Sequence, residues 1–165
     1  MDKSEIFGKR YKDANIEELE GFTLEERNEF REWAAYLQPG WLVLVGPTGT
    51  GKTHIAAAIT DDLPGMTTAR YSERMLIENH ISDEGFPDCV IVDHLGIIYP
   101  TQQEKKDMEE LLSNMRATQN SVIICTDLHY GPLTSRWGRR VADEIYSHNN
   151  IIVDLSRFKS HRTGA

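Results

Sequence analysis

Gly46-Pro47-Thr48-Gly49-Thr50-Gly51-Lys52-Thr53 matches the pattern G-x-x-x-x-G-K-[ST] at every fixed position. An apolar run over 41–45 precedes it, and an alanine-rich segment over 54–59 follows it. A strand, a glycine loop and a helix in this order are the context that a phosphate-binding loop requires. The sequence therefore predicts a nucleoside triphosphate site here, rather than an incidental glycine-rich turn.

The residue types in this loop each suit an anion. Gly46, Gly49 and Gly51 allow backbone conformations that side chains exclude, and they let N–H groups approach a phosphate. The helix that begins near Lys52 points its positive dipole end at the same place. Lys52 can reach the terminal phosphates of ATP, and the Thr53 hydroxyl can ligate Mg²⁺.

Length and composition indicate one ordinary globular domain. The chain has 165 residues, of which 39% are hydrophobic and 27% charged. No apolar run approaches the roughly 20 residues of a membrane span, and the first residues lack the order of a signal peptide. Cys89 and Cys125 fall in apolar runs, where cysteine is usually a small hydrophobic residue. We expect a cytoplasmic protein that does not contact a membrane.

The net charge of −8 argues against broad, sequence-independent binding to nucleic acid. The segment 136–162 is nevertheless locally basic, with six basic residues against three acidic ones. Single-stranded DNA is held by cations and stacking aromatic rings, so this segment and its Phe158 are the best candidates for a DNA contact. The alternative is a solvated tail.

Strand and helix patterns alternate along the chain. The apolar runs are unbroken, as in strands that are covered on both faces, so the sequence predicts an α/β domain with a mostly parallel sheet. We expect an N-terminal arm over 1–22, partly ordered, and a core over 23–165 whose last residues, 154–165, fray. The expected strands are 41–45, 67–71, 89–93, 121–126 and 151–153. The expected helices are 24–37, 52–63, 72–81, 101–115 and 135–146. A capping box at Thr23 and Glu26 opens the first helix, and Ser72 caps the third.

Asp93 closes the third expected strand, about 40 residues after Lys52. A carboxylate there lies at the ligand-binding end of a parallel sheet and can hold Mg²⁺ through water. Many P-loop ATPases follow this Asp with Glu, which polarises the attacking water, but this chain has His94. An imidazole can act as a general base near neutral pH, or it can simply pack under the loop. We expect slow hydrolysis, and a nucleotide-dependent switch more than a motor.

Asp127 and a set of three arginines could also act on the γ-phosphate of a bound nucleotide. Asp127 follows the fourth strand, where it could orient water or cap the next segment, and its charge would need a metal or an Arg to offset it. Arg136, Arg139 and Arg140 are expected on one side of one helix. They form either a solvated face or, with Arg140 the leading candidate, a cation that reaches a neighbouring subunit's site.

The stretch 41–59 resembles the corresponding part of the DnaC/IstB-like AAA+ ATPases, which include replicative helicase loaders and the ATPase helpers of transposases. His54 after Lys-Thr and the alanine-rich helix are typical of this group. Further segments are similar to its motifs, with His94, Asp127, Arg139 and Glu144 as departures. These segments are 92–96, 124–128, 138–143 and the closing strand and tail 154–162. The arm 10–14 is similar as well, and the resemblance implies that its Tyr11 helps to enclose the nucleotide base.

The resemblance implies a three-layer P-loop fold with a five-stranded parallel sheet in the order 5-1-4-3-2 and little or no C-terminal lid. It implies binding of ATP with Mg²⁺, and an ATP-dependent homo-oligomer that acts on a replicative helicase or transposase and on single-stranded DNA. There is little room before residue 7 for the separate domain by which many loaders grip their helicase.

Two other classes of protein stay open. A small-molecule P-loop kinase would need an acceptor site after the second strand and an Arg-bearing lid, for which the segment 136–140 is a candidate. Arg70, Glu73 and Arg74, the charges near that strand, fit an ordinary helix surface equally well. A non-enzymatic adaptor would bind ATP only to fix its shape or oligomeric state.

Overall fold

The computed structural model describes residues 3–36, 40–63, 65–78 and 85–158. Some expected features lie outside these ranges: the end of the first expected helix at Leu37 and Pro39, the stop at Pro64, the helix end at His80 and Ile81, and the tail from Lys159 onward.

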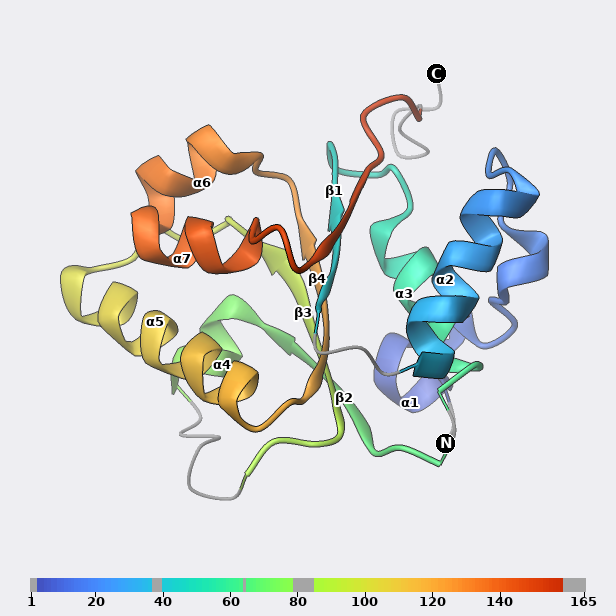
Figure 1. The fold of residues 1–165 in the computed structure, drawn as a ribbon, viewed down its shortest axis with the longest axis horizontal. Coiled ribbons are helices and arrows are strands. Elements are labelled where there is room, and N and C mark those ends of the chain that lie inside the picture. Colours follow the sequence, from blue (N-terminus) through green and yellow to red (C-terminus); the bar gives the residue numbers. More distant parts are fainter. Residues whose placement is uncertain (1–2, 37–39, 64, 79–84, 159–165) are drawn as a thin grey trace.

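A five-stranded parallel sheet forms the middle layer of the molecule (Figure 1). Its strands lie in the order β2-β3-β4-β1-β5, and all neighbouring strands run parallel. Read from the other edge, this is the order 5-1-4-3-2, so the predicted fold class is confirmed. The strands are β1 (Leu42–Val45), β2 (Thr68–Ser72), β3 (Cys89–Leu95), β4 (Ser121–Thr126) and β5 (Ile151–Asp154).

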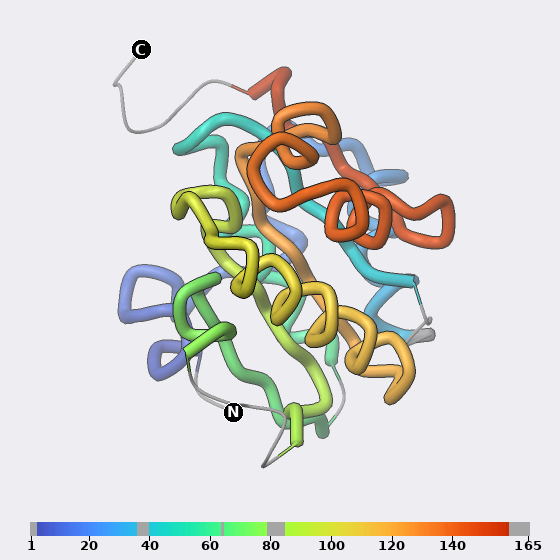
Figure 2. The backbone as a smooth tube through the Cα atoms, turned by 90° about the vertical axis from the view of Figure 1, so that its left-hand side faces the viewer, coloured from blue at the N-terminus to red at the C-terminus, as the bar shows by residue number. Residues whose placement is uncertain are grey.

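Helices cover both faces of this sheet (Figure 1). Figure 2 views the molecule from the second face, where α5 crosses in front of the strands. Among the described residues, no helix is both long and apolar enough to cross a membrane. The first face carries α1 (Lys3–Phe7), α2 (Leu24–Tyr36) and α3 (Lys52–Thr60), with short 3-10 helices η1 (Lys9–Tyr11) and η2 (Ile16–Glu18), and the second carries α4 (Glu73–Glu78), α5 (Gln102–Ala117), α6 (Tyr130–Trp137) and α7 (Arg139–Ile145).

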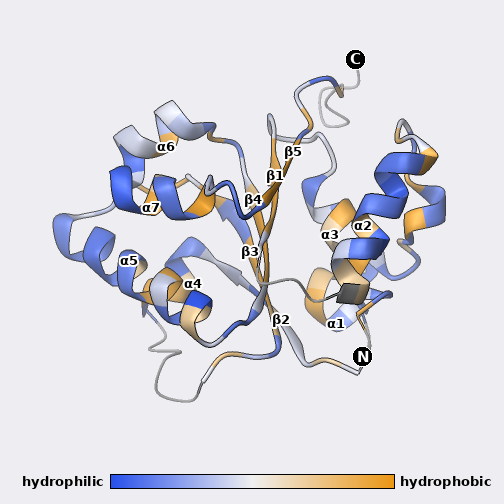
Figure 3. Ribbon diagram, viewed as in Figure 1, coloured by the Kyte–Doolittle hydropathy of each residue, from blue (hydrophilic) through white to orange (hydrophobic). Residues whose placement is uncertain are grey.

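One apolar cluster lies on each side of the sheet. Successive side chains of a strand point to opposite faces, so Leu42 and Leu44 join the cluster with α3, whereas Val43 joins the cluster with α5. Figure 3 shows the hydrophobic residues concentrated along the strands. Cys89 and Cys125 are free and buried, as predicted, and burial raises the pKa of the Cys89 thiol to about 12.

Two predicted helix starts are confirmed. Before α2, the Glu26 amide donates to the Thr23 hydroxyl at 3.1 Å, and the Thr23 amide donates to the Glu26 carboxylate at 3.2 Å. The Ser72 hydroxyl accepts a hydrogen bond from the Met75 amide at 3.2 Å, so Ser72 caps α4 while also ending β2. Both caps satisfy amides that have no partner inside their helices.

The single helix predicted over 135–146 is wrong. The chain instead forms α6 and α7, which meet at Gly138, where φ is +96°. A positive φ interrupts the helical backbone, and glycine adopts it without strain. Arg136 therefore lies in α6, whereas Arg139 and Arg140 lie in α7, and the three arginines do not share one helix.

The N-terminal segment, residues 3–22, packs against α3 and β2. Lys3 forms an ion pair with Asp61 at 2.7 Å, which ties the start of the segment to the end of α3. Later residues of the segment, between Arg10 and Phe22, face the glycine loop across a cavity. The segment's buried side chains belong to the same apolar cluster as α3, and they are Phe7, Ala14, Ile16, Leu19 and Phe22.

Residues 155–158, which follow β5, are packed against the core, contrary to the prediction that the chain frays from residue 154. Leu155 is fully buried, and its amide donates to the Val45 carbonyl at 2.7 Å. The Phe158 ring stacks on Phe22 with the ring centroids 4.8 Å apart. Arg157 covers both rings and forms an ion pair with Glu26. Phe158 is thus half-buried, with its ring stacked on Phe22.

Candidate nucleotide-binding site

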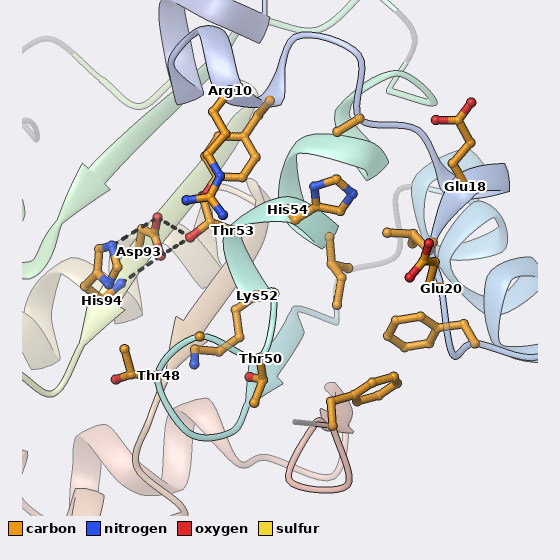
Figure 4. Close-up of a pocket in the computed structure, with 18 of the residues that line it drawn as sticks. Arg10, Glu18, Glu20, Thr48, Thr50, Lys52, Thr53, His54, Asp93 and His94 are labelled. Carbon is orange, nitrogen blue, oxygen red and sulfur yellow. Dashed lines mark hydrogen bonds and ion pairs between the residues drawn. The ribbon is translucent and has the colours of Figure 1, made fainter. Parts of the chain in front are cut away.

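A cavity of about 530 Å³ lies at the carboxyl end of the sheet, between the glycine loop and the N-terminal segment (Figure 4). The loop leaves β1 after Val45 and enters α3 at Lys52. Gly49 and Gly51 have φ values of +86° and +96°, which glycine adopts freely. The loop therefore presents its backbone and the first turn of α3 to the cavity, an arrangement that suits an anion.

Lys52 lies at the polar end of this cavity and is almost fully buried. Its ammonium donates to the carbonyl oxygens of Gly46 at 2.7 Å and Pro47 at 2.9 Å. It also forms an ion pair with Asp127 at 2.9 Å. These contacts fix the ammonium above the loop, where it can meet a phosphate.

Thr53 and Asp93 meet on the neighbouring side of the cavity (Figure 4). The Thr53 hydroxyl lies 3.0 and 3.2 Å from the two carboxylate oxygens of Asp93. A hydroxyl and a carboxylate are the hard oxygen ligands that Mg²⁺ prefers, so the pair fits a magnesium ion that arrives with a nucleotide. Arg70 also contacts Asp93, through an ion pair of 2.7 Å.

His94 lies beside Asp93 because β3 contains an irregularity there. The pairing of β3 with β4 shifts between Val92 and Leu95, and His94 has a φ of +57°. Its amide donates to Asp93 at 3.0 Å, while its ring lies 3.7 Å from the same carboxylate and is 42% exposed. The imidazole thus lines the cavity and is open to water, rather than packed beneath the loop.

Asp127 lines the same cavity and reaches the glycine loop. Its carboxylate accepts a hydrogen bond from the Thr48 hydroxyl at 2.7 Å as well as the ion pair from Lys52. Partial burial raises the pKa of Asp127, but the hydrogen bonds from Lys52 and Thr48 outweigh burial and lower the pKa overall. Asp127 does not take the capping role considered for it, since α6 follows His129 without a side-chain cap and the nearby Leu128 amide donates to the Thr126 hydroxyl at 3.1 Å.

Asp127→Asn is expected to tighten ATP binding by about threefold to tenfold, because it removes a negative charge that competes with phosphate for Lys52. The effect is moderate because the Asp127 side chain is 42% exposed and water screens its charge. Calorimetric titration with ATP measures it, with Asp62→Asn, an exposed position away from the cavity, as the control. Weaker binding by Asp127→Asn would show that the carboxylate assists the nucleotide.

The far end of the cavity combines aromatic and acidic side chains. The Tyr11 ring lies with its centroid 6.1 Å from that of His54, and both line the cavity. In Figure 4, Glu18 and Glu20 lie on the opposite side of the cavity from Asp93. The cationic end at Lys52 suits the phosphates of a nucleotide, and the aromatic rings suit its base. Besides the two rings, the apolar lining comes from Ala14, Leu19, Phe22 and Phe158.

The three candidate arginines lie away from this cavity. Arg140 has a side chain that is 86% exposed and lies 3.8 Å from Glu109 of α5, and Arg139 is similarly exposed beside Asp143. Arg136 donates to the carbonyl oxygens of Gly96 and Ile98, so it does not form a lid over the loop. Any contact of Arg140 with a nucleotide would have to be made in another subunit.

Sequence reasoning missed two residues near the site. It left Arg70 and Glu73 as either part of a kinase acceptor site or ordinary helix surface, but Arg70 lies in β2 against Asp93, and Glu73 is 2% exposed. A signal for Arg70 existed, since it lies near the carboxyl end of a strand beside the strand of Asp93. No local pattern indicates that Glu73 is buried.

Comparison with known proteins agrees with this geometry. A model of the family described as "IstB-like ATP binding protein" matches residues 30–154, which is well over half of the chain. The chain belongs to this family. The family is described as ATP-binding, which agrees with a cavity in this IstB-like protein that suits a phosphate.

Individual relatives are more distant. The chain is 27% identical over 126 residues to the protein YdaV of Escherichia coli (strain K12), covering 67% of this chain and 51% of YdaV. It is 21% identical over 140 residues to the replicative helicase loader DnaC of the same strain, covering 74% of this chain and 57% of DnaC. The IstB-like chain thus spans little more than half the length of these relatives. A crystal structure of the DnaC helicase loader superposes with a TM-score of 0.73 at 22% identity, covering 92% of this chain and 99% of that one, which shows the shared fold.

Proposed function

We propose that this protein binds ATP with Mg²⁺ and acts as a nucleotide-dependent loader or regulator of a partner at DNA. The observation that carries the proposal is the meeting of Lys52, Thr53 and Asp93 around one cavity behind the glycine loop. Lys52 would hold the terminal phosphates, and Thr53 and Asp93 would hold the metal. Tyr11 and His54 would border the nucleotide base and ribose.

The partner class follows from the relatives. One relative is named a replicative helicase loader, and the family takes its name from IstB-like proteins. We infer a replicative helicase or a transposase as the partner, and an ATP-dependent homo-oligomer in which the exposed Arg140 reaches a neighbouring site. The kinase alternative loses support because Arg136 is held by two carbonyl oxygens instead of facing the loop.

Contact with single-stranded DNA is supported by a surface that sequence reasoning did not identify. The Tyr99 side chain follows β3 and is 82% exposed, and the Arg136 guanidinium lies 3.8 Å from the centre of its ring. An exposed aromatic ring beside a cation is the pair by which proteins stack on unpaired bases. This pair replaces Phe158 as the candidate DNA contact.

The proposal is tested by measuring ATP binding and ATP turnover of the purified protein, with and without a single-stranded oligonucleotide. We expect ATP to bind, turnover to be slow, and DNA to raise it. Failure to bind ATP would refute the proposal. Phosphate transfer to small acceptors would favour the kinase, and tight binding without turnover under any condition would favour the adaptor.

His94→Glu is expected to raise the rate of ATP hydrolysis by about tenfold or more, because a carboxylate beside Asp93 polarises water better than an imidazole, which carries no fixed negative charge. Single-turnover hydrolysis with saturating protein measures the chemical step directly. The control is His148→Glu, which makes the same change at an exposed position outside the cavity. If wild type is already fast and His94→Glu is slower, the histidine is itself the effective base.

A further inference from the structure

Arg70 contacts the carboxylate that is expected to organise the metal. Its Nε donates to Asp93 Oδ2 at 2.9 Å, and its Nη2 lies 2.7 Å from the same oxygen. Both guanidinium contacts therefore go to one carboxylate oxygen. The Asp93 side chain is 4% exposed, so water screens this ion pair weakly.

The fold holds Arg70 in this position. In the pairing of β2 with β3, Arg70 lies beside Ile91 and Ser72 lies beside Asp93, so Arg70 reaches Asp93 diagonally across two parallel strands. The Phe7 ring of α1 covers the guanidinium at 5.9 Å. Arg70 is only 28% exposed and approaches Asp93 from the β2 side, outside the residues that line the cavity.

Every neighbour of the Asp93 carboxylate affects what a metal would meet. Besides Arg70, the carboxylate accepts hydrogen bonds from the Thr53 hydroxyl and from the His94 amide. The His94 ring lies 3.7 Å away. A magnesium ion or its water at Oδ2 would share that oxygen with the guanidinium, and one at Oδ1 would still meet the guanidinium on the same carboxylate, so the two cations repel each other.

The same cation has an opposite effect on the nucleotide. Without metal, a bare Asp93 carboxylate would repel the phosphates that bind beside Lys52. Arg70 already neutralises that charge from inside the protein. A polyphosphate therefore meets much less repulsion from Asp93 when no divalent cation is present.

We propose that Arg70 is a built-in counter-ion that makes nucleotide binding only weakly dependent on Mg²⁺. Arg70 would set how strongly ATP binding at the proposed site depends on Mg²⁺, and the inference rests on that proposed function. Arg70 acts through Asp93 and is a positioning residue, not a catalytic one. The alternative is a purely structural ion pair between two strands, which predicts no change in metal dependence when Arg70 is replaced.

The test measures the dissociation constant of ATP bearing a fluorescent ribose label, once with saturating Mg²⁺ and once with excess EDTA. For wild type, we expect the two constants to agree within about threefold. For Arg70→Met, which keeps the side-chain length but removes the charge, we expect EDTA to weaken binding by about tenfold or more. Arg74→Met is the matched control, since Arg74 lies four residues further along, is 51% exposed and pairs with Glu78 and Glu104 instead of Asp93.

The inference would be overturned if wild type lost about tenfold or more of its affinity for the labelled ATP in EDTA. It would also be overturned if wild type and Arg70→Met showed the same dependence on Mg²⁺. The wild-type comparison stands even if Arg70→Met does not fold, and Arg70→Lys, which keeps the charge, should behave like wild type. A wild type that binds the labelled ATP in neither buffer would instead refute the proposed function.

Discussion

Lys52→Ala is expected to weaken ATP binding by about a hundredfold or more. Hydrogen bonds between charged groups contribute about 1.5–3 kcal/mol each, and the ammonium can make two to the phosphates of ATP. The loss of about 3 kcal/mol corresponds to the expected factor. Lys52 is almost fully buried at the polar end of the cavity, and the other described Arg or Lys in the cavity lining, Arg10, belongs to the N-terminal segment instead of the glycine loop.

Calorimetric titration of ATP into wild type and Lys52→Ala provides the measurement. Lys106→Ala is the control, since Lys106 is an exposed lysine of α5 outside the cavity. Thermal unfolding of all three proteins separates a binding defect from a folding defect. Binding by Lys52→Ala within about threefold of wild type would show that ATP does not occupy the glycine loop as proposed.

Glu73→Ala is expected to lower the free energy of unfolding by about 3 kcal/mol or more, because it leaves buried N–H groups without a partner. One carboxylate oxygen accepts the amides of Ile97 at 2.7 Å and Ile98 at 2.6 Å. The other accepts the Gly96 amide at 2.8 Å and the Trp137 indole at 3.1 Å. Glu73 thus joins the start of α4, the loop after β3 and the end of α6.

Urea unfolding of Glu73→Ala and Glu73→Gln measures this effect. Glutamine should rescue only part of the loss, because all four partners are donors and the amide nitrogen of glutamine cannot accept their hydrogen bonds. Glu78→Ala, at a side chain that is 59% exposed, should change the free energy of unfolding by less than about 0.5 kcal/mol. Wild-type stability in Glu73→Ala would mean that the loop finds other acceptors.

The sequence predicted those features that depend on neighbouring residues. Unbroken apolar runs predicted the inner strands β3 and β4, because a strand buried on both faces has no polar side to alternate with. The loop 46–53 predicted the phosphate cavity, because its spacing alone brings glycines, Lys52 and Thr53 to one helix start. Asp93 was found for the same reason, since the carboxyl ends of parallel strands meet at one edge.

Other features were decided only by the tertiary structure. Arg70 reaches Asp93 because of the register between β2 and β3, and Glu73 is buried because the loop after β3 folds back over it. Asp127 pairs with Lys52 only where the end of β4 comes beside the loop that follows β1. These contacts join residues 23 to 75 positions apart, and their energies depend on distances and burial that no local pattern contains. The sequence determined where a nucleotide can bind, and the packing of the strands decided which charges it would meet there.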